Sequence, residues 1–122
     1  MEVFDMNVKY LDKGTQNHTT IEVLKDPKYN APNDYKITSF KTNQDLCTLH
    51  FQEGATKDVG VNGIFMEDLI NICIDRLEHY QKSDFACREN AIAITHLETA
   101  LLWLNKRTND RIKRGVQGTY KK

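Results

Sequence analysis

The chain has 122 residues, of which 39% are hydrophobic, 28% charged and 9% aromatic, with only two prolines and six glycines. This composition is typical of a folded soluble domain and excludes a disordered or linker-rich chain. No apolar run approaches the ~20 residues that a membrane span needs. The first residues also lack a signal-peptide pattern, so we expect no membrane association and a cytoplasmic location.

Charge is balanced overall but unevenly distributed. Lys and Arg together number 17, as do Asp and Glu, which argues against a protein that binds nucleic acid over its whole surface. Residues 105–122, however, carry seven basic residues and one acidic residue, a local balance of +6. A neutral chain with one basic end indicates a localised anionic partner.

The first sixty residues show the alternation of apolar and polar side chains that is typical of half-buried strands. Candidate strands lie, in chain order, at residues 4–10, 18–25, 35–41, 46–52 and, as a short fifth piece, near 57–61. The connections between them have turn and loop composition, and both prolines lie in residues 26–34. Successive strands joined by short turns usually pair with their neighbours, so the sequence predicts an antiparallel meander.

From Gly63 onward the apolar spacing changes to the three-to-four-residue period of an amphipathic helix. Residues 82–87 interrupt the pattern, and a second helix is predicted from about Arg88 to about Lys113. Gly115 is a natural residue to end that helix. A short connection between two long helices predicts an antiparallel hairpin.

The predicted fold class is therefore α+β, in one domain with two halves. Residues 1–62 form a small antiparallel N-terminal β-sheet, and residues 63–122 form a C-terminal antiparallel helical hairpin with a basic tail. Such a hairpin alone cannot bury all its apolar surface. We therefore expect a homo-oligomer built across the helices.

The most informative cluster of polar residues is Arg107, Arg111 and Arg114, which fall within an arc of about 60° on one helix face. They could be a solvated face that complements the negative end of the helix dipole. They could also form a phosphate site, since guanidinium matches phosphate bidentately, and the use of Arg rather than Lys favours this alternative. Trp103, one turn earlier, could stack on a guanidinium or a base, or anchor a core or an interface.

A second candidate lies between the helices. Phe85 could be a hydrophobic staple on the second helix or could stack on a purine, and Asn90 could read a base edge or ribose hydroxyl or make a local turn hydrogen bond. There is no Walker loop, no GxGxxG, no CxxC and no histidine pair at ligand spacing. We therefore predict no catalytic residues, no cofactor and no metal site.

The segment FACRENA, the segment HLETALLWLNKRTNDR and the following RGVQGTY together resemble a known signature. It is that of the hairpin domain shared by phage Thoeris anti-defence and anti-CBASS sponge proteins, over roughly residues 64–122. The preceding strand-rich half resembles the Thoeris branch. Members are not enzymes. They bind glycocyclic ADP-ribose, a signal made by bacterial TIR proteins, and hold it unmodified and away from its effector in the cytoplasm of the infected host.

The resemblance also implies roles for individual residues. Arg107 and Arg111, with Arg114 beside them, would hold the diphosphate; Phe85 and Asn90 would meet the adenine and ribose; Gly118, Thr119 and Tyr120 would close over the ligand. Tyr120 stands where many members have His. Relatives also bind cyclic oligonucleotides and assemble as dimers or hexamers. On the residues alone, a nucleic-acid-binding module with a basic tail and a structural oligomer stay open as alternatives.

Overall fold

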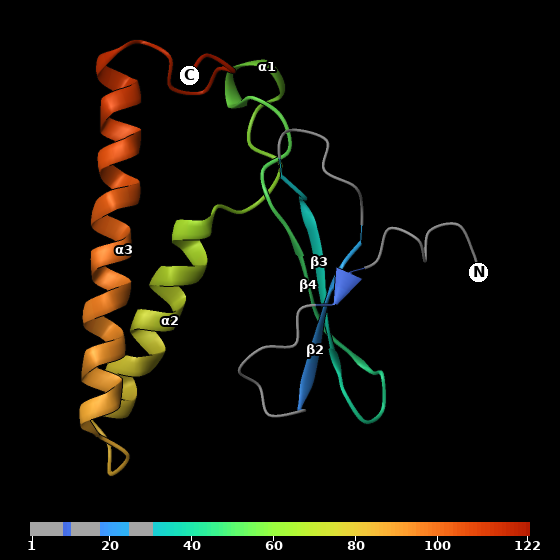
Figure 1. Ribbon diagram of the computed structural model, residues 1–122, viewed down its shortest axis with the longest axis vertical. Coiled ribbons are helices and arrows are strands. Elements are labelled where there is room, and N and C mark those ends of the chain that lie inside the picture. Colours follow the sequence, from blue (N-terminus) through green and yellow to red (C-terminus); the bar gives the residue numbers. More distant parts are fainter. Residues whose placement is uncertain (1–8, 11–17, 25–30) are drawn as a thin grey trace. The chain divides into compact units, whose positions relative to one another are not determined.

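A computed structural model describes residues 9–10, 18–24 and 31–122 (Figure 1). The chain divides into two compact units, Met1–Ile64 and Phe65–Lys122. The first unit contains the strands and the second the long helices, so the predicted α+β class is confirmed.

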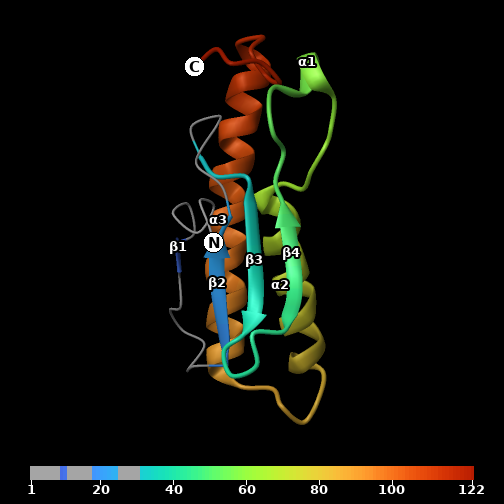
Figure 2. The ribbon, with the colours of Figure 1, turned by 90° about the vertical axis from the view of Figure 1, so that its right-hand side faces the viewer.

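The first unit is built on a four-stranded antiparallel sheet in the order β1-β2-β3-β4, and Figure 2 shows β2, β3 and β4 side by side. The strands are β1 (Lys9–Tyr10), β2 (Thr19–Val23), β3 (Asp34–Ser39) and β4 (Asp45–His50). Each strand pairs with its neighbour in the chain, which confirms the predicted meander. Residues 4–8 of the first predicted strand lie outside the described residues.

The core of this sheet is small and partly polar. Val23 and Thr38 are buried, and the ring of Tyr35 meets that of Phe51 edge-on at 5.6 Å between centroids. The register puts Ile21 opposite Ile37, as the alternation of apolar residues requires. This packing supports the ends of β3 and β4, where a polar cluster described below is located.

The predicted strand near residues 57–61 is wrong, because the structure has a short helix, α1 (Thr56–Val59), at this place. Two successive amides of this turn donate to the carbonyl oxygen of Ala55. The side-chain amide of Gln52 reaches across the loop to the carbonyl oxygen of Gly60 at 2.7 Å. These local bonds hold the segment in a closed loop, so the alternation of apolar residues does not produce a strand.

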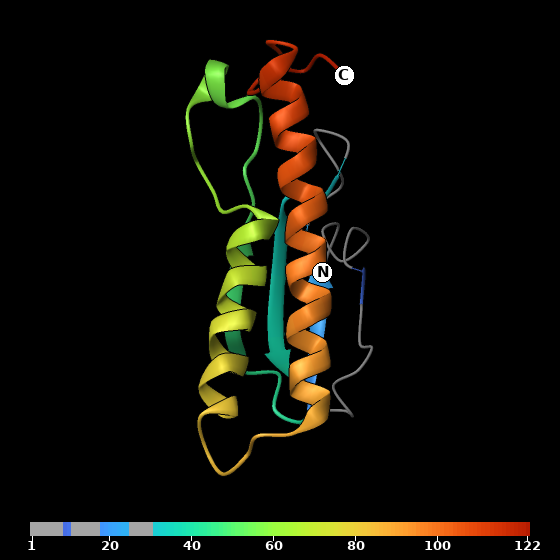
Figure 3. The ribbon, with the colours of Figure 1, turned by 90° about the vertical axis from the view of Figure 1, so that its left-hand side faces the viewer.

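The second unit is an antiparallel hairpin of α2 (Met66–Gln81) and α3 (Arg88–Lys113), as predicted (Figure 3). Helix α2 begins where the carboxylate of Asp68 accepts the backbone N–H of Phe65 at 2.9 Å. Ile74 of α2 is buried, and the expected stripe on α3 is half-buried. That stripe consists of Ile94, Leu97, Leu101 and Leu104.

Helix α3 ends in a Schellman motif at Gly115, as the sequence indicates. The residue has φ +73°, its N–H donates to the carbonyl oxygen of Ile112, and the N–H of Val116 donates to that of Arg111 at 3.0 Å. The chain thereby reverses and the tail turns back. Among the described helices, none combines the length and the apolar character that crossing a membrane would require.

Candidate ligand-binding site

The three predicted arginines lie at the C-terminal end of α3 but differ in what they contact. Arg107 is exposed and makes no hydrogen bond or ion pair with any residue that the structure describes. Arg111 is half-buried, and its guanidinium donates to main-chain carbonyl oxygens of residues 116, 119 and 121. Arg114 donates to the carbonyl oxygen of Lys122. Arg111 and Arg114 therefore bind the protein's own tail.

The tail, residues 116–122, folds back on the end of α3. Gly118 has φ +77°, a conformation that suits glycine, and reverses the chain a second time. The hydroxyl of Thr119 donates to the carbonyl oxygen of Val116 and accepts the N–H of Lys121. Tyr120 is exposed. Gly118, Thr119 and Tyr120 thus lie at the arginine end, as the sequence-based hypothesis requires.

The positive potential of this end is not cancelled by Asp110, its single acidic residue. The Nζ of Lys106 lies 2.9 Å from the Asp110 carboxylate. The hydrogen bond and charge of Lys106, assisted by the charges of Lys113 and Arg114, hold the pKa of Asp110 below its usual 3.8. Asp110 is therefore ionised and paired with a lysine, and Arg107 keeps an unpaired charge.

At the opposite end of α3, the turn between the helices is held by side-chain bonds. The amide of Gln81 both donates to the carbonyl oxygen of Cys87 and accepts its N–H, each at 3.0 Å. Asn90 makes the expected local bond, in which its Nδ2 donates to the carbonyl oxygen of Phe85 at 3.3 Å. The Phe85 side chain is 75% exposed, so it is not a hydrophobic staple. It projects from a fixed turn and is available to stack.

The predicted site residues therefore form two groups at opposite ends of one helix. At about 1.5 Å of rise per residue, Asn90 and Arg111 lie about 32 Å apart along α3. Helix α3 is continuous between them. The structure brings the arginines together with the tail, and Phe85 together with Asn90, but a single copy does not bring the two groups together.

Large apolar side chains are exposed along the hairpin between these ends. Trp103 is 66% exposed and lies one helical turn from Arg107, and Leu102 beside it is 70% exposed. Trp103 is thus excluded from the core of this unit, while its roles in stacking or at an interface both stay open. On α2, Ile72 is also exposed.

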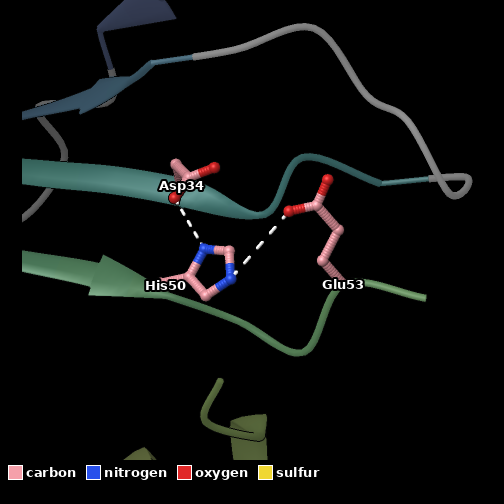
Figure 4. Close-up of side chains that lie close together, drawn as sticks. All are labelled: Asp34, His50 and Glu53. Carbon is pink, nitrogen blue, oxygen red and sulfur yellow. Dashed lines mark hydrogen bonds and ion pairs between the residues drawn. The ribbon is translucent and has the colours of Figure 1, made fainter. Parts of the chain in front are cut away.

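A polar cluster in the first unit was not found from the sequence (Figure 4). The Nδ1 of His50 lies 2.7 Å from Oδ1 of Asp34, and its Nε2 lies 3.9 Å from Oε1 of Glu53. One possible metal-ligand atom from each of the three residues, a ring nitrogen or a carboxylate oxygen, lies within 4.8 Å of the other two. The imidazole stands between the two carboxylates, so each ring nitrogen faces one of them. This arrangement ties the start of β3 to the end of β4. The pairing of Asp34 with His50 in the β3–β4 register could have indicated it.

Comparison with known proteins identifies a family over the end of the first unit and most of the second. Residues 49–109 match the family described as Acb2/Tad1, hairpin domain. The chain belongs to this family. It is also 51% identical over 90 residues to Thoeris anti-defense 1 of Bacillus phage SBSphiJ7. The alignment covers 74% of this chain but 63% of the relative, so the chain spans less than two thirds of that protein's length. The family assignment made from the sequence signature is confirmed.

Proposed function

We propose that this member of the Acb2/Tad1 hairpin family is a phage anti-defence protein that binds and sequesters glycocyclic ADP-ribose. The signal is made by bacterial TIR proteins, and its capture in the cytoplasm of the infected cell keeps the Thoeris effector inactive. The protein holds the ligand without cleaving it. The proposal is carried by the 51% identity to Thoeris anti-defense 1. The match to the hairpin family, over residues 49–109, includes Phe85 and Arg107.

The chemistry of the two ends fits the parts of such a ligand. A diphosphate is an anion with several acceptor oxygens, and an exposed arginine without a protein partner is suited to bind it in a bidentate manner. An adenine offers a flat aromatic face to Phe85, and Asn90 has an amide oxygen that no described residue engages. The basic end is therefore suited to bind the phosphates, and the turn end is suited to bind the nucleoside.

Because these ends are about 32 Å apart in one copy, the complete site requires a second copy. A two-fold axis that crosses α3 near residues 100–101 would place Asn90 of one copy opposite Arg111 of the other. The same axis repeats the arrangement, so a dimer contains two sites. Trp103 lies close to this axis, and its large exposed surface is suited to the interface. Higher assemblies are compatible with this dimer.

The affinity that sequestration demands is within reach of these groups. Capture of a signal present at micromolar concentration needs a binding free energy beyond roughly −8 kcal/mol. Hydrogen bonds to a charged group contribute about 1.5–3 kcal/mol each. Two or three of them, with stacking on Phe85, approach the required value. Both half-sites are already held by protein hydrogen bonds, which keeps the ordering cost low.

The proposal is tested by titrating the protein with glycocyclic ADP-ribose in a calorimeter, and then denaturing the complex by heat. Mass spectrometry of the released material should give the mass of the intact ligand. A linear product would place the protein among enzymes. If the titration gives no heat and no ligand is released from the protein, the proposal is refuted. Lys113→Ala, which removes a charge from the same end away from the arginine face, is the matched control for Arg107→Ala.

Cyclic oligonucleotides and nucleic acid are alternative ligands for the basic end. Each is titrated in parallel with glycocyclic ADP-ribose. Affinity for DNA or RNA that falls steeply with salt would favour a nucleic-acid-binding module. A well-folded assembly without any nucleotide ligand would instead favour a structural oligomer.

A further inference from the structure

The tail is fixed to α3 largely by one side chain. The Nη1 of Arg111 donates to the carbonyl oxygen of Lys121 at 2.7 Å, and its Nη2 donates to those of Val116 and Thr119 at 3.0 and 2.9 Å. Three of the five N–H donors of the guanidinium are therefore directed at the main chain of the tail. Arg107, one turn earlier on the same face, makes no hydrogen bond or ion pair with the described residues.

We propose that Arg111 is a positioning residue that shapes the tail around the ligand, whereas Arg107 is the arginine that contacts the diphosphate. The inference rests on the proposed function only for the identity of the ligand. The two arginines of the RTxxR segment thereby have different tasks, although they share residue type, helix face and spacing. Arg111 acts on the ligand through Gly118, Thr119 and Tyr120, which it holds in place.

The requirement for arginine at position 111 follows from geometry. The three carbonyl oxygens belong to residues 116, 119 and 121, and they converge because Gly118 turns the chain at φ +77°. Two separate nitrogens of one planar group reach them. A lysine has the same charge but presents its donors from a single nitrogen, so it cannot span this set. At position 107 the charge itself is needed, and lysine can retain part of the affinity for phosphate.

The first experiment measures the free protein and needs no ligand. Hydrogen exchange of the tail amides is compared in wild type, Arg111→Lys and Arg107→Lys. We expect exchange in residues 116–121 to become at least about tenfold faster in Arg111→Lys, because hydrogen bonds to a charged group are lost, and to stay unchanged in Arg107→Lys. Equal protection in the two variants would overturn the proposal.

The second experiment is a double-mutant cycle with glycocyclic ADP-ribose measured by calorimetry. Gly118→Ala strains the turn that Arg111 holds, so the two substitutions should impair binding through the same structure. The double variant should therefore bind only slightly less tightly than whichever single variant has the lower affinity. Arg107→Ala and Gly118→Ala should instead multiply their losses. Multiplying losses for the Arg111 pair would show that Arg111 acts on the ligand independently of the tail.

The two experiments separate this inference from the proposed function. If wild type binds no glycocyclic ADP-ribose, the proposed function fails, while the exchange measurement still decides whether Arg111 shapes the tail. If wild type binds and the tail is unaffected by Arg111→Lys, the positioning role fails and the function stands.

Discussion

If the site is shared between two copies, two variants that each weaken binding of glycocyclic ADP-ribose should give one intact site when they are combined in one dimer. Phe85→Ala removes the aromatic group of the turn end, and Arg107→Ala removes the cation of the arginine end, about 30 Å away along α3. If each site is built from two copies, a mixed dimer has one site with both residues intact and one site that lacks both. Separate homodimers of either variant have no intact site.

The expected size of the effect follows from the same geometry. Loss of one or two charge-assisted hydrogen bonds at Arg107 costs about 1.5–3 kcal/mol each, which lowers affinity by about tenfold to more than a hundredfold. A mixed dimer purified through two different tags should then bind at wild-type affinity with half the wild-type stoichiometry. Random mixing, in which about half of the dimers are mixed, should give about one quarter.

Calorimetry measures both quantities in one titration, and each variant homodimer serves as the control for its own loss. Wild-type protein carrying the same two tags controls for tag effects. If mixed dimers bind no better than the homodimers, the site is not shared between copies in this way. The phosphate site would then belong to the arginine end of one copy alone.

Four further variants, one of them a control, test the fold, the interface and the charges. Gly63→Ala should lower the melting temperature markedly, because the new Cβ would lie 2.6 Å from main-chain atoms of His50 and Phe51. Gly60→Ala has open space around the new Cβ, so it should cost only the backbone strain of φ +76° and ψ −172°, about 1–3 kcal/mol. Trp103→Ala should shift the proposed dimer toward monomer in analytical ultracentrifugation, and an unchanged sedimentation profile would exclude Trp103 from the proposed interface. Because its pKa is lowered in the folded protein, ionised Asp110 stabilises the end of α3 above pH 3.8, and this contribution should be lost as the pH falls further. Any difference in helix content between wild type and Asp110→Asn, measured by circular dichroism, should therefore disappear at strongly acidic pH.

The helical hairpin could be predicted from the sequence because its signals are local. The apolar period of residues 63–81 and 88–113 depends only on neighbours three and four positions away. Gly115 ends α3 as predicted, since positive φ at that position favours glycine. The helix bounds therefore followed from the pattern of residue types, as did the common face of the arginines.

The loop before α2 shows where local patterns fail. Residues 57–61 alternate like a strand, but Gln52 and Asn62 bond to each other and to the loop backbone across about ten residues. Such side-chain bonds compete with strand pairing and are not visible in the alternation. The contact of His50 with Asp34 was missed for a related reason, since it depends on the register that the β3–β4 turn sets.

The sequence predicted which residues form the candidate site but not which partners each of them contacts. Arg107 and Arg111 look equivalent in the pattern, since they lie one turn apart on one face. The difference between them arises from the tail, which bends back and offers its carbonyl oxygens to Arg111 alone of the two. No periodicity within α3 encodes the path of a segment that follows it.

A long helix with half a site at each end has a consequence for how the proposed pocket is built. Because α3 is continuous, its residue count fixes the distance between the Phe85 turn and the arginine end, and no loop movement within one copy can change it. The dimensions of the pocket are then set by where two copies cross. In the proposed dimer, residues near the crossing, such as Leu102 and Trp103, would control affinity without touching the ligand. A shift of the axis by one residue would move the two half-sites by about 3 Å relative to each other.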